Sequence, residues 1–154
     1  MHDDFSDLEP PRLNDFNQIF LTERLTLLHL ARVPIVLKNY NDGQSRTWHP
    51  SAKSRNEIEY TLGLYGHRME QPFDEPVVLR ITRVLGYKQS KWDSDSGLRG
   101  NAKQLIDSLV ACGWFHDDSS KYITETRFTQ FEPTVREALS STIIEVFRAE
   151  QIFS

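Results

Sequence analysis

One stretch of the chain, residues 93–118, constrains its fold most strongly, because it has the pattern of an amphipathic helix with acidic residues beyond both ends. Apolar residues recur there at three- and four-residue steps, as on the buried face of a helix. Gly113 follows the last of them and suits the left-handed residue that ends a helix. We predict a core-packed helix that ends at Gly113 and carries the apolar stripe Leu98, Ala102, Leu105, Ile106, Leu109, Val110 and Cys112.

Two acidic pairs flank this helix. Asp93 and Asp95 precede it, in a loop with two serines and a glycine, and Asp117 and Asp118 follow it. Carboxylates held close together raise one another's pKa and repel, unless a cation or a proton neutralises them. Mg²⁺ and Mn²⁺ are hard cations that prefer such oxygen ligands. A helix rises about 1.5 Å per residue, so the two pairs meet only if the chain reverses after Gly113.

The arrangement resembles the core motif of the RusA-type Holliday-junction resolvases, which are common in phages and prophages. That motif consists of an Asp-x-Asp-Asn loop, a helix with a Lys and an Asp one turn later, a Gly, and an Asp-Asp pair. Ser96 stands where the family has Asn, and the loop before the helix is longer here. Similarity extends over about residues 25–148, but only 93–118 is specific. The matching residues are Asp93, Asp95, Lys103, Asp107, Gly113, Asp117 and Asp118.

The resemblance implies a fold and an activity. The fold would be α+β, a small mixed sheet with helices packed on it, in which the chain after Gly113 returns beside a strand at 77–85. The activity would be Mg²⁺- or Mn²⁺-dependent endonuclease cleavage of branched DNA such as Holliday junctions, by phosphodiester hydrolysis, during recombination and repair. A homodimer would suit a four-way junction, because symmetric nicks need two related active sites.

The resemblance also implies roles for individual residues. Lys103 would contact the scissile phosphate or assist the nucleophile, and Asp107 and Asp117 would orient ligands or water. The metal ligands would be Asp93, Asp95 and Asp118. Together with Lys103, these three residues would form the catalytic set. Four basic residues are expected to contact DNA: Arg83, Lys88, Lys91 and Arg99. Arg80 and Arg83 lie three positions apart in one expected strand, so at most one of them can face the site.

Charge is distributed unevenly along the chain. Residues 1–24 hold six acidic residues against Arg12 and Arg24, and this excess equals the whole formal net charge of −4. Residues 31–91 hold ten basic residues against six acidic ones. DNA binding needs a cationic face rather than a cationic total, so this balance permits it without indicating it. We expect residues 1–22 to form an acidic N-terminal appendage to one domain at 23–154.

Other features bear on the compartment. No apolar run approaches the roughly 20 residues needed to span a bilayer, and the N-terminus lacks the pattern of a signal peptide. Cys112 is the only cysteine, which excludes a disulfide framework and fits a reducing cytoplasm. We expect a cytoplasmic protein that makes no contact with membranes.

The remaining elements follow from local patterns. Residues 142–147 suit a strand, although their apolar spacing also suits a helix. The mixture indicates an α+β domain. We expect strands at 24–31, continued at 34–37 after a break, at 77–85 and at 121–131, a helix at 51–65 with Ile58, Leu62 and Tyr65 inward, and a helical piece near 134–139.

Two alternatives remain open at this point. Aspartates and serines are common at helix starts and in turns, so the acidic pairs could be solvated caps and turns. Lys103 and Asp107 could equally form an ordinary surface pair one helical turn apart. The competing function is a catalytically diverged DNA-binding or regulatory protein that keeps the fold, and Ser96 and the acidic N-terminal residues favour it.

Overall fold

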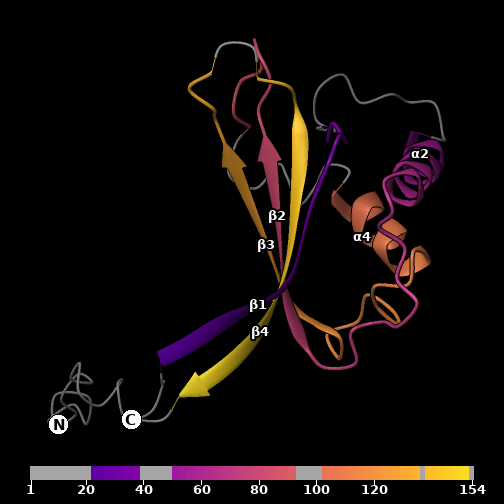
Figure 1. Cartoon of the computed structure of the whole chain (residues 1–154), viewed down its shortest axis with the longest axis vertical. Helices are drawn as coiled ribbons and strands as arrows, with labels where there is room; N and C mark the ends of the chain where they lie inside the picture. Colours follow the sequence, from indigo (N-terminus) through magenta and orange to yellow (C-terminus); the bar gives the residue numbers. More distant parts are fainter. Residues whose placement is uncertain (1–21, 39–49, 93–101, 136–137, 153–154) are drawn as a thin grey trace, which may run out of the picture.

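In the part of the chain that the structure describes, a four-stranded mixed sheet carries two helices on one face (Figure 1). We describe a computed structural model of the chain, over residues 22–38, 50–92, 102–135 and 138–152. The elements in chain order are β1 (Thr22–Val33), α2 (Pro50–Leu64), β2 (Val77–Val84), α4 (Ala102–Ala111), β3 (Ile123–Phe131) and β4 (Ser141–Ile152). This is the single α+β domain with a small mixed sheet that the sequence predicts.

The order of strands in the sheet is β1-β4-β2-β3. The central strand β4 pairs antiparallel with both β1 and β2, whereas β2 and β3 pair in parallel. Parallel neighbours need a crossover, and α4 lies within it. The connections that follow β2 and β3 therefore leave the sheet at the same end, which is at the top of Figure 1.

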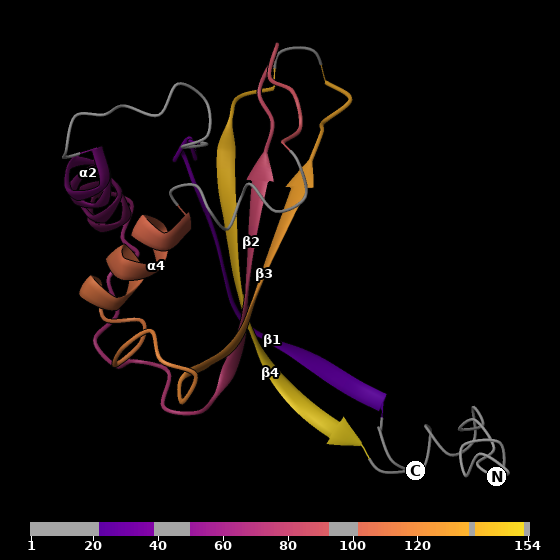
Figure 2. The same cartoon turned by 180° about the vertical axis from the view of Figure 1, so that it is seen from behind.

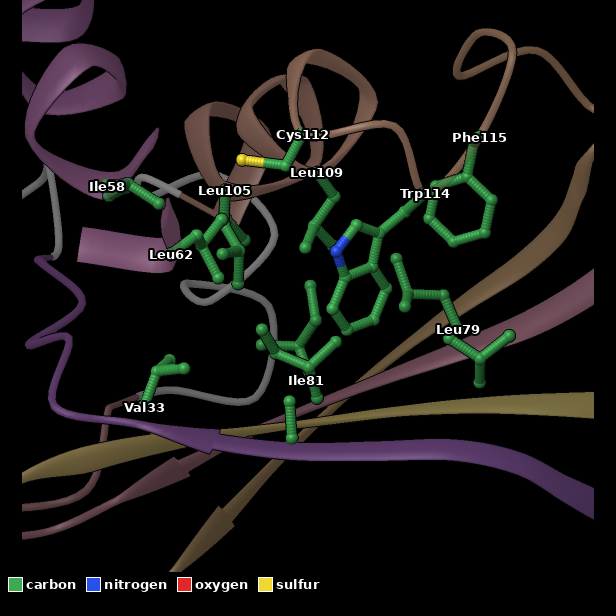
Figure 3. Close-up of a cluster of buried hydrophobic side chains, with 14 of the residues drawn as sticks. Val33, Ile58, Leu62, Leu79, Ile81, Leu105, Leu109, Cys112, Trp114 and Phe115 are labelled. Carbon is green, nitrogen blue, oxygen red and sulfur yellow. The ribbon is translucent and has the colours of Figure 1, made fainter. Parts of the chain in front are cut away.

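The core lies between the sheet and the two helices (Figures 1 and 2). Ile81 of β2 points toward Leu105 and Leu109 of α4, and Leu79 of β2 points toward Trp114 (Figure 3). All of these side chains are buried. Trp114, just after α4, is fully buried among them. Each such side chain contributes about 1.5–3 kcal/mol by leaving water. This packing fixes α4 on the sheet, and with it the polar residues on the outer side of the helix.

Strands β1 and β4 run beyond the rest of the sheet as a two-stranded arm (Figures 1 and 2). Their register shifts between Leu27 and His29, so Leu28 has no partner opposite it. Such a bulge increases the local twist of a strand pair. Among the described residues, no helix is long and apolar enough to cross a membrane.

The element predictions can now be compared with the structure. The strands expected at 24–31, 77–85 and 121–131 are present as β1, β2 and β3, and residues 142–147 form part of β4 rather than a helix. The helix expected at 51–65 is present as α2 and begins one residue earlier, at Pro50. The predicted stripe of the next helix is buried at Ala102, Leu105, Leu109 and Cys112. Leu98 lies outside the described residues.

Three local predictions were wrong. Residues 34–37 do not extend β1, because Pro34 lacks an N–H for the ladder and the pairing with β4 ends at Val33. The described residues of 134–139 form no helix, although Ala138 N donates to Val135 O in a single turn. Tyr65 is 55% exposed rather than inward, since α2 has already ended at Leu64.

Candidate functional site

The outer side of α4 brings together three of the charged residues that the sequence singles out. Lys103 Nζ lies 3.3 Å from Asp107 Oδ1, one turn along the helix. The same nitrogen lies 3.1 Å from Asp118 Oδ2, a residue from the connection between α4 and β3. One ammonium group therefore bridges two carboxylates, and one of them comes from fifteen positions further along the chain.

The electrostatics of this cluster favour a charged lysine. The pKa of Lys103 is raised by its hydrogen bond to Asp118 and, to a smaller extent, by its hydrogen bond to Asp107. All three side chains are substantially exposed, at 62% for Lys103, 31% for Asp107 and 47% for Asp118. Ion pairs this exposed contribute at most about 1 kcal/mol each to stability. The stability of the fold is therefore a weak reason for this arrangement.

The position of Asp118 depends on how α4 ends. Gly113 has a φ of 87°, in the left-handed region, as its place after the apolar stripe predicts. Its N–H bonds to Val110 O at 3.0 Å, and Trp114 N–H bonds to Leu109 O at 3.0 Å. This pair of bonds is the Schellman arrangement, which satisfies the last carbonyl groups of a helix and turns the chain. The chain thus reverses directly after the helix.

The reversed segment is then anchored against the connection that follows α2. Trp114 Nε1–H donates to His67 O at 2.6 Å, and Phe73 N–H donates to Trp114 O at 2.9 Å. Met69 N–H donates to Cys112 O at 2.9 Å. These bonds fix the chain on both sides of Gly113. They place residues 116–118 on the outside of the core, within reach of α4.

Asp117 has a different role from its neighbour. Its Oδ1 accepts a hydrogen bond from the backbone N–H of Ser119 at 2.7 Å. Hydrogen bonding to the Ser119 side chain, and secondarily to this N–H, lowers the pKa of the carboxyl group. The side chain is fully exposed. Asp117 therefore stabilises the turn that carries Asp118, which matches the alternative in which this acidic pair contains a turn residue.

A second polar cluster, at the end of β2 and β3, holds the residue that precedes the acidic loop. The Gln130 amide makes both backbone hydrogen bonds of Trp92: its Oε1 accepts from Trp92 N–H at 2.9 Å and its Nε2 donates to Trp92 O at 3.1 Å. Arg83 donates to the same Oε1 at 3.0 Å and to Ser90 O at 3.0 Å. We call Arg83, Trp92, Phe128 and Gln130 the Trp92 clamp.

Aromatic contacts complete the Trp92 clamp. The guanidinium carbon of Arg83 lies 3.9 Å from the centre of the Trp92 ring. The ring of Phe128 is nearly parallel to that of Trp92, and the two ring centres are 6.1 Å apart. Arg83 is only 4% exposed, so it is not presented at the surface as a phosphate contact, contrary to the expectation from sequence. Its role in the structure is to hold Trp92.

Arg80 and Arg83 lie on opposite faces of β2, as their spacing predicts. Arg80 pairs with Glu145 of β4 through two hydrogen bonds of 2.8 and 2.9 Å, on the face away from the helices. Lys88 and Lys91 are exposed on the connection after β2. Four residues singled out by the sequence lie outside the described residues, so the structure gives no distance from them to Asp118: Asp93, Asp95, Ser96 and Arg99.

Sequence reasoning missed the contribution of Gln130. Its neighbours in β3 alternate in the way that places Phe128 and Gln130 on one face, but nothing local pairs that amide with Trp92. Within the described ranges, no three histidine, cysteine or acidic residues lie close enough together to hold a metal ion. Comparison of the sequence with protein-family models and with curated proteins gave no match.

Proposed function

We propose that this protein is a metal-dependent endonuclease that cuts branched DNA, including Holliday junctions, by hydrolysis of phosphodiester bonds. The observation that carries the proposal is the convergence of Asp107 and Asp118 on Lys103. These residues meet although the chain must end a helix and reverse between them. They also occupy the positions at which the sequence resembles the RusA-type motif. An exposed cluster that adds little stability but needs this much structure is typical of a functional site.

The donors present suit a hard divalent cation. Asp107 and Asp118 direct carboxylate oxygens toward one point, which the Lys103 ammonium group shares. In the proposal Asp93, Asp95 and Asp118 would hold Mg²⁺ or Mn²⁺, and the Asp118 carboxylate that now pairs with Lys103 would be shared with the cation. When bound, the metal lowers the pKa of a coordinated water and stabilises the negative charge that develops on the phosphate.

The chain's own residues then bind and orient the DNA. Lys103 binds the scissile phosphate as a cation, and Asp107 keeps its side chain in place from one turn along α4. Asp117 fixes the turn that presents Asp118. The Trp92 clamp holds the residue directly before Asp93, and so defines where the acidic loop begins. Arg83 and Gln130 are positioning residues in this scheme.

Binding to DNA and assembly complete the proposal. Lys88 and Lys91, which are exposed, and Arg99 contact the DNA backbone. Two copies form a homodimer, so that two active sites related by a two-fold axis reach opposite strands of a junction. The protein acts in the cytoplasm, where its single buried thiol, Cys112, stays reduced.

Cleavage of a synthetic four-way junction by the purified full-length chain tests this proposal. With Mg²⁺ or Mn²⁺, the native protein should nick the junction in preference to linear duplex. Asp118→Asn should leave DNA binding largely intact but greatly reduce cleavage. Loss of a residue that only orients a metal ligand costs roughly 10–100-fold, and loss of a ligand itself should cost more.

Asp117→Asn is the matched control for this experiment. It makes the same change one residue away, and asparagine can still accept the hydrogen bond from Ser119. This variant should keep most of the activity. Cleavage by Asp118→Asn at the native rate, or no cleavage by the native protein with either metal, would overturn the nuclease.

One observation favours a second function, that of a catalytically diverged DNA-binding or regulatory protein. Lys103 already pairs with both Asp107 and Asp118 and offsets part of their charge, and the Asp117 carboxylate is engaged in its turn. A site whose carboxylates are all paired in this way folds without a metal. Binding of junction DNA without cleavage, and with the same affinity in EDTA as in Mg²⁺, would establish this function instead.

A further inference from the structure

A hollow of about 300 Å³ lies at the end of the sheet where β2 and β3 finish (top of Figure 1). One wall is the turn at residues 85–89, which follows β2. The other wall consists of residues 132–135 and Ala138, which follow β3. Both connections leave at this end because the two strands are parallel. The first connection continues through the Trp92 clamp to the acidic loop, so the hollow is close in the chain to the proposed active site.

Hydrogen bonds hold the turn that forms the first wall. Gln89 N–H donates to Gly86 O at 3.1 Å, and the side chain of Gln89 accepts from Gly86 N–H at 2.7 Å. Tyr87 N–H donates to Ala138 O at 3.1 Å, which joins the two walls. Lys88 has a φ of 66°, and it is the one non-glycine residue in the left-handed region among those described. Lysine adopts that conformation at a cost which glycine would avoid.

The unfavourable backbone of Lys88 brings two complementary groups together. Its ammonium nitrogen lies 5.5 Å from the centre of the Tyr87 ring. The ring itself is 54% exposed beside the hollow. The turn therefore presents an aromatic face and a cation at one place. An unusual backbone conformation that achieves this is better explained by binding than by stability.

The chemistry of the walls selects one kind of ligand. The volume is at the low end of the roughly 300–1,000 Å³ of small-ligand pockets, so it suits a single flat ring system and excludes a double helix. An aromatic face stacks on any nucleobase, and a lysine beside it binds the adjoining phosphate. Glu132 lines the opposite wall. A carboxylate there disfavours a free anion and accepts a hydrogen bond from the exocyclic amino group of a base.

We infer that this hollow binds one unpaired nucleobase of a DNA strand, with Tyr87 stacked on the base, Lys88 on its phosphate and Glu132 on its amino group. The inference rests on the proposed function for its choice of DNA as the ligand. It goes further by giving the protein a site for bases that are unstacked, as they are where a duplex is interrupted. Adenine, cytosine and guanine fit the Glu132 wall, whereas thymine lacks the amino group.

Binding to a duplex with one bulged 2-aminopurine tests the inference. The full-length chain is titrated in EDTA against this duplex and against the same sequence fully paired, with fluorescence of the bulged base as the readout. Native protein should bind the bulged duplex more tightly and quench its fluorescence. Tyr87→Ala should weaken binding of the bulged duplex by about tenfold and leave the paired duplex within twofold. Tyr87→Phe should restore the native behaviour.

Two further variants separate binding from folding. Tyr60→Ala is the matched control, since Tyr60 is a tyrosine on α2 that is even more exposed than Tyr87, at 68%. It should change neither affinity. Lys88→Gly should weaken binding of the bulged duplex. The melting temperature of this protein variant should stay at or above the native value, because glycine adopts the left-handed backbone conformation without strain. Quenching that is unchanged in both Tyr87→Ala and Lys88→Gly would overturn the inference.

The remaining outcomes distinguish this inference from the nuclease. A protein that cleaves branched DNA but shows no preference for the bulged duplex overturns the nucleobase site alone. A protein that prefers the bulged duplex but cleaves no branched DNA would support the nucleobase site and overturn the proposed nuclease activity. Loss of self-association in Tyr87→Ala, with DNA binding unchanged, would assign this surface to a protein contact and overturn the inference.

Discussion

At the scale of single residues, the Lys103 ammonium group is bound to Asp118, and a metal ion would compete with it for that carboxylate. This ammonium group bridges Asp107 and Asp118. Lys103→Met removes this cation and leaves the two carboxylates to repel each other, so Mg²⁺ should stabilise the variant more than the native protein. The Mg²⁺-induced rise in melting temperature should be larger by at least about 2 °C, or roughly 1 kcal/mol for a domain of this size. Thermal unfolding in EDTA and in Mg²⁺ measures it.

A matched lysine on the other helix provides the control for this prediction. Lys53 forms an exposed pair with Glu57, also one turn apart, at 4.0 Å. Lys53→Met should leave the response to Mg²⁺ unchanged, because it removes a lysine of the same kind away from the site. If Mg²⁺ shifts the melting temperature of Lys103→Met no further than that of Lys53→Met, competition between the ammonium group and a cation at Asp118 is excluded.

At the scale of elements, the two helices end in the same way but against different surroundings. Gly66 after α2 and Gly113 after α4 both have positive φ and both form Schellman bonds. A Cβ at Gly113 would lie 2.5 Å from Met69 O, whereas a Cβ at Gly66 would have nothing within 4 Å. Gly66→Ala should therefore cost only the backbone strain, about 1–2 kcal/mol, and Gly113→Ala should cost more. Urea unfolding compares them, and equal losses would contradict the close approach.

The elements also indicate how far sequence reasoning reaches. The stop at Gly113 and the stripe of α4 were predictable, because caps and periodicity are local properties. The pairing of β2 with β3 was expected only from the resemblance, and its parallel direction was not predicted. The contact of Gln130 with Trp92 joins residues 38 positions apart, so no local pattern contains it. Arg83 was misplaced for a related reason: spacing gives the face of a strand, but burial at its end depends on the chain that folds over it.

At the scale of the whole molecule, the ring of His29 connects β1 with the two segments that follow α2 and α4. It lies 4.8 Å from the ring of Trp114 and 6.1 Å from that of Phe73. Burial, and secondarily the charge of His67, lowers the pKa of His29 below its ordinary 6.5. Below about pH 6.5 the unfolded chain therefore takes up a proton on this histidine that the folded chain resists. The free energy of unfolding consequently decreases as the pH is lowered. His29→Phe, which keeps a ring there, should lose less stability between about pH 7.5 and about pH 5.5. Urea unfolding at both values measures the difference, and equal losses would exclude His29 as a cause.

The distribution of charge over the whole chain leads to the last prediction. Residues 1–21 contain five acidic residues and one basic residue, which equals the formal net charge of −4, so the remainder is neutral overall. Deletion of residues 1–21 removes a repulsion between the protein and DNA. Junction binding should therefore tighten at low salt, and the gain should shrink as salt rises, because screening acts over about 10 Å at 0.1 M. Fluorescence anisotropy with labelled junction DNA at two salt concentrations measures both effects. A gain that persists unchanged at high salt would show that these residues act by occupying the DNA-binding surface and not by their charge.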